Sequence, residues 1–84
     1  MSSPVAAVIE VAARALVDAP DAVSVTETSE RGATLVELTV APGDVGKVIG
    51  RQGRTADALR TLLAATAHRH GIKATLEIRD PDGR

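Results

Sequence analysis

The sequence predicts a single α+β domain whose elements follow the order helix, strand, strand, helix, helix, strand. The spacing of the apolar residues switches along the chain between the period of an amphipathic helix and the alternation of a half-buried strand. Pro, Gly or Asp residues stand at the switches, where turns are expected. The chain has 84 residues, of which 44% are hydrophobic. This composition is sufficient for one small core and therefore for one domain.

The first predicted element is a helix over residues 4–18. Ser3 followed by Pro4 is typical of a helix start, because serine caps a backbone N–H and proline needs no partner for the N–H that it lacks. The apolar residues of one helix face are Val5, Val8, Ile9, Ala12 and Leu16. The pattern stops at Asp18-Ala19-Pro20-Asp21.

A β-hairpin is predicted next. Apolar and polar residues alternate from Ala22 to Thr28, and they alternate again from Val36 to Val40. Between them lies Glu30-Arg31-Gly32, where glycine can adopt the positive φ of a tight turn. The alternation predicts two strands with one buried face.

Two helices are predicted after the hairpin. Asp44 is placed to cap a short helix that ends at Ile49. A longer helix is predicted from about residue 54 to residue 70, with Gly71 just beyond its end. Its apolar positions are Ala56, Leu59, Leu62, Leu63 and Thr66 or Ala67.

The last predicted element is a strand in which Ala74, Leu76 and Ile78 alternate with polar residues. We expect one domain over residues 1–84, with an ordered core at about residues 4–79 and a short tail at each end.

The charge of the chain is unevenly distributed. Residues 1–45 contain two basic and seven acidic side chains, a net charge of −5, whereas residues 46–73 contain six basic and one acidic, a net charge of +5. A basic segment of this kind indicates an anionic partner, although a solvated helix face can have the same composition. The absence of Phe, Tyr and Trp excludes recognition by stacking of bases on aromatic rings.

Several classes of protein are excluded by what the sequence lacks. Without cysteine there is no disulfide framework, thiolate nucleophile or Cys-based metal site. Met1-Ser2-Ser3-Pro4 lacks the basic start of a signal peptide, and the apolar stretch that follows is interrupted by charged residues. We therefore expect a cytoplasmic protein that does not enter a membrane.

No set of residues supports catalysis. Asp44 and Asp57 fit roles as a cap and as an acid in the first turn of a helix, and no Ser has a credible His partner. His68 and His70 are two residues apart and so lie on different faces of a helix, which does not favour a metal site. We expect neither an enzyme nor a bound metal or other cofactor.

Four glycines lie in the segment from Gly43 to Gly53, and glycine-rich segments are typical of phosphate-binding loops. A Walker A loop needs Ser or Thr after Gly-Lys, but Val48 follows Gly46-Lys47. A dinucleotide-binding fingerprint is excluded because the segment contains no G-x-G.

The remaining motif is Gly50-Arg51-Gln52-Gly53, which lies between two predicted helices and is flanked by Lys47 and Arg54. Two glycines allow a nucleic-acid backbone to approach the chain closely. The helix that follows presents free N–H groups to phosphates at its N-terminus. A G-x-x-G can also be an ordinary turn between helices, but its basic flanks favour nucleic-acid binding.

The run from Val40 to Arg54, followed by the helix around Ala58-Leu59-Arg60-Thr61-Leu62, resembles the small bacterial single-KH RNA-binding proteins of the KhpA (YlqC) family. The resemblance covers nearly the whole chain. It implies a type II KH domain, α-β-β-α-α-β, with a three-stranded sheet and helices packed on one face. It also implies a cytoplasmic protein that holds single-stranded RNA in a groove through a GXXG loop.

Members of this family resemble RNA chaperones or post-transcriptional regulators and are implicated in cell division, cell shape and cell-wall biogenesis. They pair with themselves or with a larger KH-containing partner, KhpB (Jag). The resemblance therefore implies single-stranded RNA and a homodimer or heterodimer as partners, and neither a membrane nor a small-molecule substrate.

The predicted RNA-binding residues form one continuous segment: Lys47, Val48, Ile49, Gly50, Arg51, Gln52, Gly53 and Arg54. Bases are expected to lie on an aliphatic floor of Val48, Ile49, Ala56 and part of the last strand. Of Val48 and Ile49, one is expected to face inward and the other to line the groove. The alternative is a protein-interaction module that dimerises or docks onto a larger KH-containing partner and binds little RNA.

Overall fold

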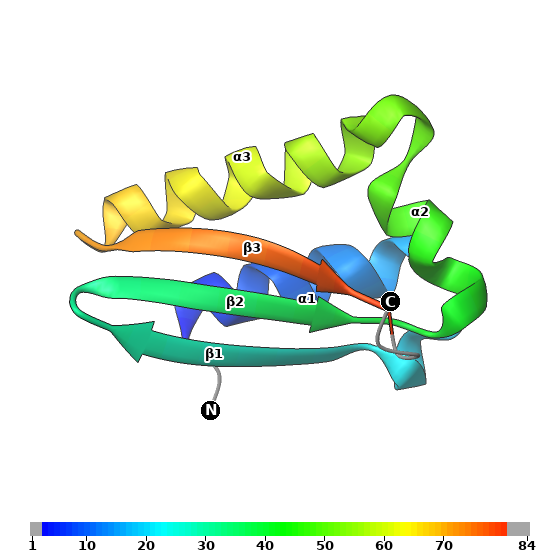
Figure 1. Ribbon diagram of the computed structural model, residues 1–84, viewed down its shortest axis with the longest axis horizontal. Coiled ribbons are helices and arrows are strands. Elements are labelled where there is room, and N and C mark those ends of the chain that lie inside the picture. Colours follow the sequence, from blue (N-terminus) through cyan, green and yellow to red (C-terminus); the bar gives the residue numbers. More distant parts are fainter. Residues whose placement is uncertain (1–2, 81–84) are drawn as a thin grey trace.

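The computed structural model describes residues 3–80. The helices and strands, in chain order, are α1 (Pro4–Leu16), β1 (Ser24–Glu30), β2 (Ala33–Thr39), α2 (Val45–Ile49), α3 (Arg54–Arg69) and β3 (Lys73–Arg79) (Figure 1). Short 3₁₀ turns lie at Pro20–Ala22, Pro42–Asp44 and Arg51–Gly53. The predicted order of elements is confirmed. The predicted tails include residues 1–2 and 81–84, which lie outside the described residues.

The three strands form one mixed sheet in the order β1-β2-β3. Strands β1 and β2 are antiparallel, as expected for a hairpin, and β2 and β3 are parallel. Parallel neighbours need a crossover connection, and α2 and α3 provide it. Because β2 and β3 run in the same direction, the end of β2, the end of β3 and helix α2 lie at the same end of the sheet (Figure 1).

Helices α1 and α3 cover one face of the sheet and leave the other face open (Figure 1). The alternation in β2 follows from this, since Thr34, Val36 and Leu38 are buried while the residues between them are partly exposed. The buried hydrophobic cluster consists of Val5, Ile9, Ala13, Val23, Val36, Leu38, Val40, Val48, Leu59, Leu63, Ala67 and Leu76. Predicted helix packing on a single face of the sheet is confirmed.

The start of α1 and the hairpin turn follow their sequence signals. The Ser3 hydroxyl accepts a hydrogen bond from the backbone N–H of Ala6 at 3.2 Å, so Ser3 is the N-cap. In the hairpin turn Arg31 and Gly32 both have positive φ, 53° and 80°, which is the pattern of a two-residue type I′ turn. The strands extend up to this turn, so β2 begins at Ala33 rather than at Val36.

Two residues predicted to lie in the core are exposed. Val5, Ile9 and Ala13 are buried in α1, at intervals of four residues. The helix ends at Leu16, two residues earlier than predicted. The next position in that series is Val17, which is partly buried, and Leu16 is exposed. Leu62 is exposed for a related reason, because successive residues of a helix are rotated by about 100° and the buried series runs through Leu63 instead.

No helix among residues 3–80 is both long enough and apolar enough to cross a membrane.

Candidate nucleic-acid interface

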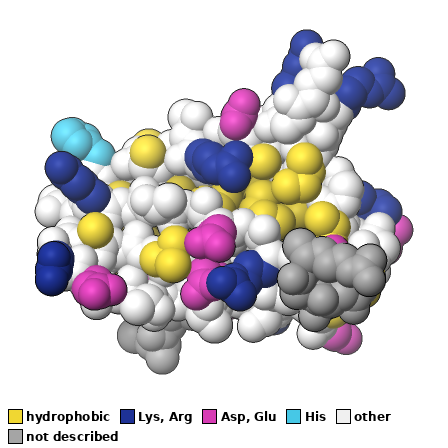
Figure 2. Space-filling view, in the orientation of Figure 1, with side chains coloured by type: hydrophobic (Ala, Val, Ile, Leu, Met, Phe, Trp, Pro, Cys, Tyr) yellow, Lys and Arg dark blue, Asp and Glu magenta, His cyan; other side chains and the backbone are white. Residues whose placement is uncertain are grey.

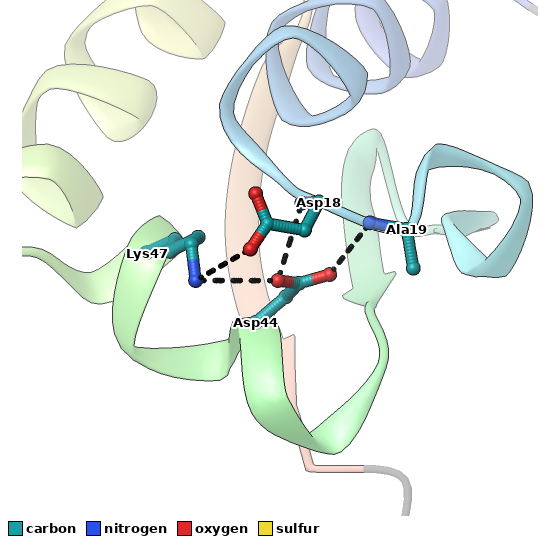
Figure 3. Close-up of polar contacts among 4 residues, drawn as sticks. All are labelled: Asp18, Ala19, Asp44 and Lys47. Atoms are coloured by element: carbon teal, nitrogen blue, oxygen red, sulfur yellow. Dashed lines mark hydrogen bonds and ion pairs between the residues drawn. The ribbon is translucent and has the colours of Figure 1, made fainter.

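The position of the predicted binding segment is fixed first by Asp44, at the start of α2 (Figure 3). Asp44 is only 4% exposed. Its carboxylate accepts hydrogen bonds from the backbone N–H of Asp18 at 3.2 Å and of Ala19 at 3.0 Å. Asp44 therefore joins the start of α2 to the segment that follows α1.

The predicted capping role of Asp44 needs a correction. Asp44 occupies the N-cap position of α2, but within residues 3–80 its side chain makes no capping hydrogen bond to that helix. The carboxylate is turned toward the end of α1 instead, where two backbone N–H groups would otherwise be without hydrogen bonds to the protein.

Lys47 completes this network. Its Nζ lies 3.2 Å from Oδ2 of Asp18 and 3.6 Å from Oδ1 of Asp44. Burial by itself would raise the pKa of Asp44, but the hydrogen bonds from Asp18 and Ala19 and the charge of Lys47 lower that pKa below its ordinary value. The hydrogen bond and charge of Asp18 raise the pKa of Lys47 in turn. Lys47, a predicted RNA contact, is thus held by two carboxylates.

Val48 and Ile49 have different environments. Val48 is fully buried in the core, whereas Ile49 is partly exposed. Of these two predicted RNA contacts, Val48 is therefore the one that faces inward and Ile49 the one that reaches the surface. The physical reason is that a five-residue helix needs a core side chain to hold it against the rest of the domain, and Val48 provides it. Ile49 is left to line the surface.

Gly50 ends α2 with φ 77° and ψ 171°, a conformation that is essentially restricted to glycine. Its N–H donates to the carbonyl of Gly46 at 2.9 Å, and its carbonyl accepts from the N–H of Gly53 at 3.1 Å. A Cβ atom at Gly50 would lie 2.8 Å from the backbone N of Thr55 and would also overlap the Thr55 side chain. The chain turns back on itself here so tightly that any side chain is excluded.

The rest of the loop presents polar side chains to solvent. Gln52 has φ 58° and Gly53 has φ 74°, so two consecutive residues are left-handed. The side chains of Arg51, Gln52 and Arg54 are exposed, and Nη2 of Arg54 donates to Oε1 of Gln52 at 3.2 Å. The loop projects beyond the body of the domain, and Lys or Arg side chains extend from its tip (Figures 1 and 2).

The N-terminus of α3 begins directly at this loop. Gly53 is the N-cap, and no side chain of residues 3–80 caps the helix. The backbone N–H of Arg54 donates to the carbonyl of Arg51. The N–H groups that follow it in the first turn have no side-chain cap and can donate to a ligand, and the helix dipole adds partial positive charge. Asp57, the acidic residue of the first turn, lies 3.5 Å from the guanidinium of Arg60. The local field therefore favours an anion beside the loop.

An apolar surface adjoins the loop. Figure 2 shows hydrophobic side chains gathered below the projecting loop, over the start of α3, α2 and the end of β3. Ile49 of α2 and Ile78 of β3 are partly exposed, whereas Val48 and Ala56 are buried. Of the residues predicted to form the aliphatic surface, Ile49 and the last strand are therefore accessible, whereas Val48 and Ala56 lie in the interior.

Other candidate features lie away from this segment. One hollow on the open face of the sheet is lined by residues that include Thr28, Arg31 and Leu35, and another at the end of α3 includes His68 and Lys73. None of the residues predicted to bind RNA lines either of them. Within the part of the chain that is described, no group of three or more His, Asp or Glu side chains is arranged to hold a metal ion.

The sequence did not indicate the part played by Asp18, Ala19 or Thr55. The contacts of Asp18 and Ala19 with Asp44 span 26 and 25 residues, and no local spacing reports such a contact. Thr55 lies just after the loop in the sequence, which is a signal that it contacts the loop. Its overlap with a Cβ placed at Gly50 depends on the turn geometry, which the sequence does not give.

A chain of order α-β-β-α-α-β, in which a GXXG loop joins two helices beside a mixed three-stranded sheet, is a type II KH domain. The sequence matches the model of the family described as KhpA/KhpB, KH domain, over residues 6–78. The chain belongs to this family.

Curated relatives are similar over most of the chain. The RNA-binding protein KhpA of Treponema pallidum (strain Nichols) is 54% identical over 68 residues, which cover 81% of this chain and 85% of the relative. KhpA of Chlamydia trachomatis is 49% identical over 63 residues, 75% of this chain and 81% of the relative. KhpA of Caldanaerobacter subterraneus is 49% identical over 70 residues, 83% of this chain and 93% of the relative.

The names of these relatives state RNA binding and no reaction. The family is not one of enzymes, and the prediction that the chain is not an enzyme is confirmed on that ground.

Proposed function

We propose that this chain binds single-stranded RNA at the loop Gly50–Gly53 and on the apolar surface beside it. The main support is the loop geometry: Gly50 and Gly53 leave the backbone free of side chains at a helix N-terminus that has no side-chain cap, and the exposed Arg51 and Arg54 follow them directly. The curated relatives named RNA-binding protein KhpA add independent support.

In this proposal the phosphates are bound electrostatically. One phosphate lies against the loop and accepts from the N–H groups at the start of α3, while Arg51 and Arg54 pair with phosphates on either side. The bases turn toward Ile49 and Ile78, where they bury apolar surface without aromatic stacking. Two or three phosphate contacts predict roughly micromolar affinity and a slope of log K against log salt of about −1.4 to −2.1.

The cellular role proposed with this activity is that of an RNA chaperone or post-transcriptional regulator in the cytoplasm, connected with cell shape and cell-wall biogenesis. Pairing with a second copy or with a KhpB-like partner belongs to the same proposal. The family description, which covers KhpA and KhpB together, is consistent with such a partner.

The proposal is tested by fluorescence anisotropy with a short labelled single-stranded RNA. The test variant combines Arg51→Asp and Gln52→Asp, which keeps both glycines and adds negative charge at the loop. The control combines Arg31→Asp and Thr28→Asp, both at exposed positions near the hairpin turn, at the end of the sheet opposite α2, with the same change of net charge. Circular dichroism confirms that each variant is folded.

We expect the loop variant to lose binding and the hairpin variant to bind within about twofold of the wild type, since charge far from the contact is screened. Equal binding by the two variants, or no binding by the wild type, would show that RNA is not recognised through this loop. The protein-interaction module would then be the function to pursue.

A further inference from the structure

Lys47 lies in α2, which leads directly into the GXXG loop. It precedes Gly50, the C-cap of this helix, by three residues, which is less than one helical turn. A lysine side chain is long enough to bring its ammonium to a phosphate bound at the loop. In this structure the ammonium is held by Asp18 and Asp44 instead (Figure 3).

The two carboxylates that hold Lys47 are not equivalent. Asp44 is buried, and its oxygens also accept hydrogen bonds from two backbone N–H groups. The side chain of Asp18 is 81% exposed, and within residues 3–80 Lys47 is its only ion-pair partner. The side chain of Lys47 is 43% exposed, so water and ions reach the pair.

Release of Lys47 therefore leaves no buried group without a partner. Asp44 keeps its two backbone donors, and the Asp18 carboxylate becomes hydrated. Lys47 paired with Asp18 and Lys47 paired with an RNA phosphate are expected to be close in free energy, because exposed ion pairs contribute little to stability. Removal of the Asp18 charge is therefore enough to favour the pair with the phosphate.

We propose that Asp18 restrains Lys47 and so lowers the affinity of the chain for RNA. Lys47 pairs with Asp18 in the free protein and with a phosphate in the complex, and the carboxylate at the end of α1 competes with the RNA for one cation. Asp18 touches no RNA in this account and acts only through Lys47. The inference rests on the proposed function, since it requires RNA at the loop.

The test is a double-mutant cycle of Asp18→Asn and Lys47→Gln, measured as the Kd for a short single-stranded RNA. Asparagine has nearly the same shape as aspartate, and residue 18 keeps the backbone N–H that donates a hydrogen bond to Asp44. The matched control is Asp21→Asn, which removes the same charge three residues further on, from an exposed residue in the turn Pro20–Ala22. Thermal unfolding confirms that every variant is folded.

We expect Asp18→Asn to bind RNA about two- to fivefold more tightly, and we expect this gain to disappear in the Lys47→Gln background. Asp21→Asn should change the Kd by less than half as much. High salt should reduce the gain, because it screens both pairs of charges.

Unchanged or weaker binding by Asp18→Asn overturns the inference, and so does a gain that persists without Lys47 or that Asp21→Asn reproduces. These results leave the proposed function standing as long as the wild type binds RNA and the Arg51→Asp, Gln52→Asp variant does not. Failure of the wild type to bind RNA overturns both.

Discussion

The carboxylate of Asp44 accepts a hydrogen bond from the backbone N–H of Ala19 at 3.0 Å across 25 residues of sequence. This bond, with the adjacent one from Asp18, joins the end of α1 to the start of α2. Since α2 ends at Ile49 and the loop begins at the next residue, the same contact positions the loop. A buried carboxylate that accepts backbone hydrogen bonds does so best when it is ionised, so the position of the loop is linked to pH.

The first prediction is that acid weakens this connection. The pKa of Asp44 in the folded protein lies below the ordinary value of 3.8, so Asp44 contributes its full stabilisation above that value and loses it as pH falls through the lowered pKa. Urea unfolding between about pH 5 and pH 2 should show a loss of stability that Asp44→Asn reduces. Asp21→Asn should retain the wild-type profile. Identical acid profiles for Asp44→Asn and the wild type would refute the role of Asp44.

The second prediction concerns Gly50→Ala. Its φ and ψ are essentially restricted to glycine, and a Cβ there meets Thr55, so we expect the free energy of unfolding to fall by more than about 2 kcal/mol. RNA binding should be lost with the loop geometry. The control is Gly43→Ala, where φ is not positive and no atom lies within 4 Å of the new Cβ. Equal unfolding midpoints for the two variants would disprove the steric argument.

The third prediction is that Gly46→Ala stabilises the protein. Gly46 lies within α2, is exposed, and has open space where a Cβ would be placed. Alanine in a helix is favoured over glycine by about 0.5–1 kcal/mol. The urea midpoint should rise accordingly, and a fall would show that Gly46 makes a contact that the structure does not contain.

The fourth prediction separates two neighbouring leucines of α3. Leu63 is 1% exposed and Leu62 is 40% exposed. Leu63→Ala should lower the free energy of unfolding by about 2–5 kcal/mol, because it leaves a cavity in the core. Leu62→Ala should cost no more than about 1 kcal/mol. Urea unfolding of both variants checks this, and comparable losses would mean that α3 is rotated relative to the sheet.

Most of the secondary structure could be predicted because its signals are local. Ser3 and Pro4 mark the start of α1, and Gly71 follows the end of α3, so both boundaries depend on residues next to them. The loop was predictable for the same reason, since Gly50 and Gly53 have fixed spacing between two helical patterns.

The sequence could not predict contacts that depend on how elements pack. The bonds from Asp18 and Ala19 to Asp44 form only when the end of α1 meets the start of α2, and local spacing suggested a helix cap instead. Burial of Val48 rather than Ile49 depends in the same way on which side of α2 meets the core.

The most direct test of RNA binding at the loop is a titration of ¹⁵N-labelled protein with a short single-stranded RNA, followed by amide chemical shifts. The proposed interface predicts that the largest changes fall at residues 46–57 and at Ile78, and that the open face of the sheet, at Thr26 and Glu37, is unchanged. Changes on the open face with no response from Gly50 to Gly53 would contradict RNA binding at the GXXG loop.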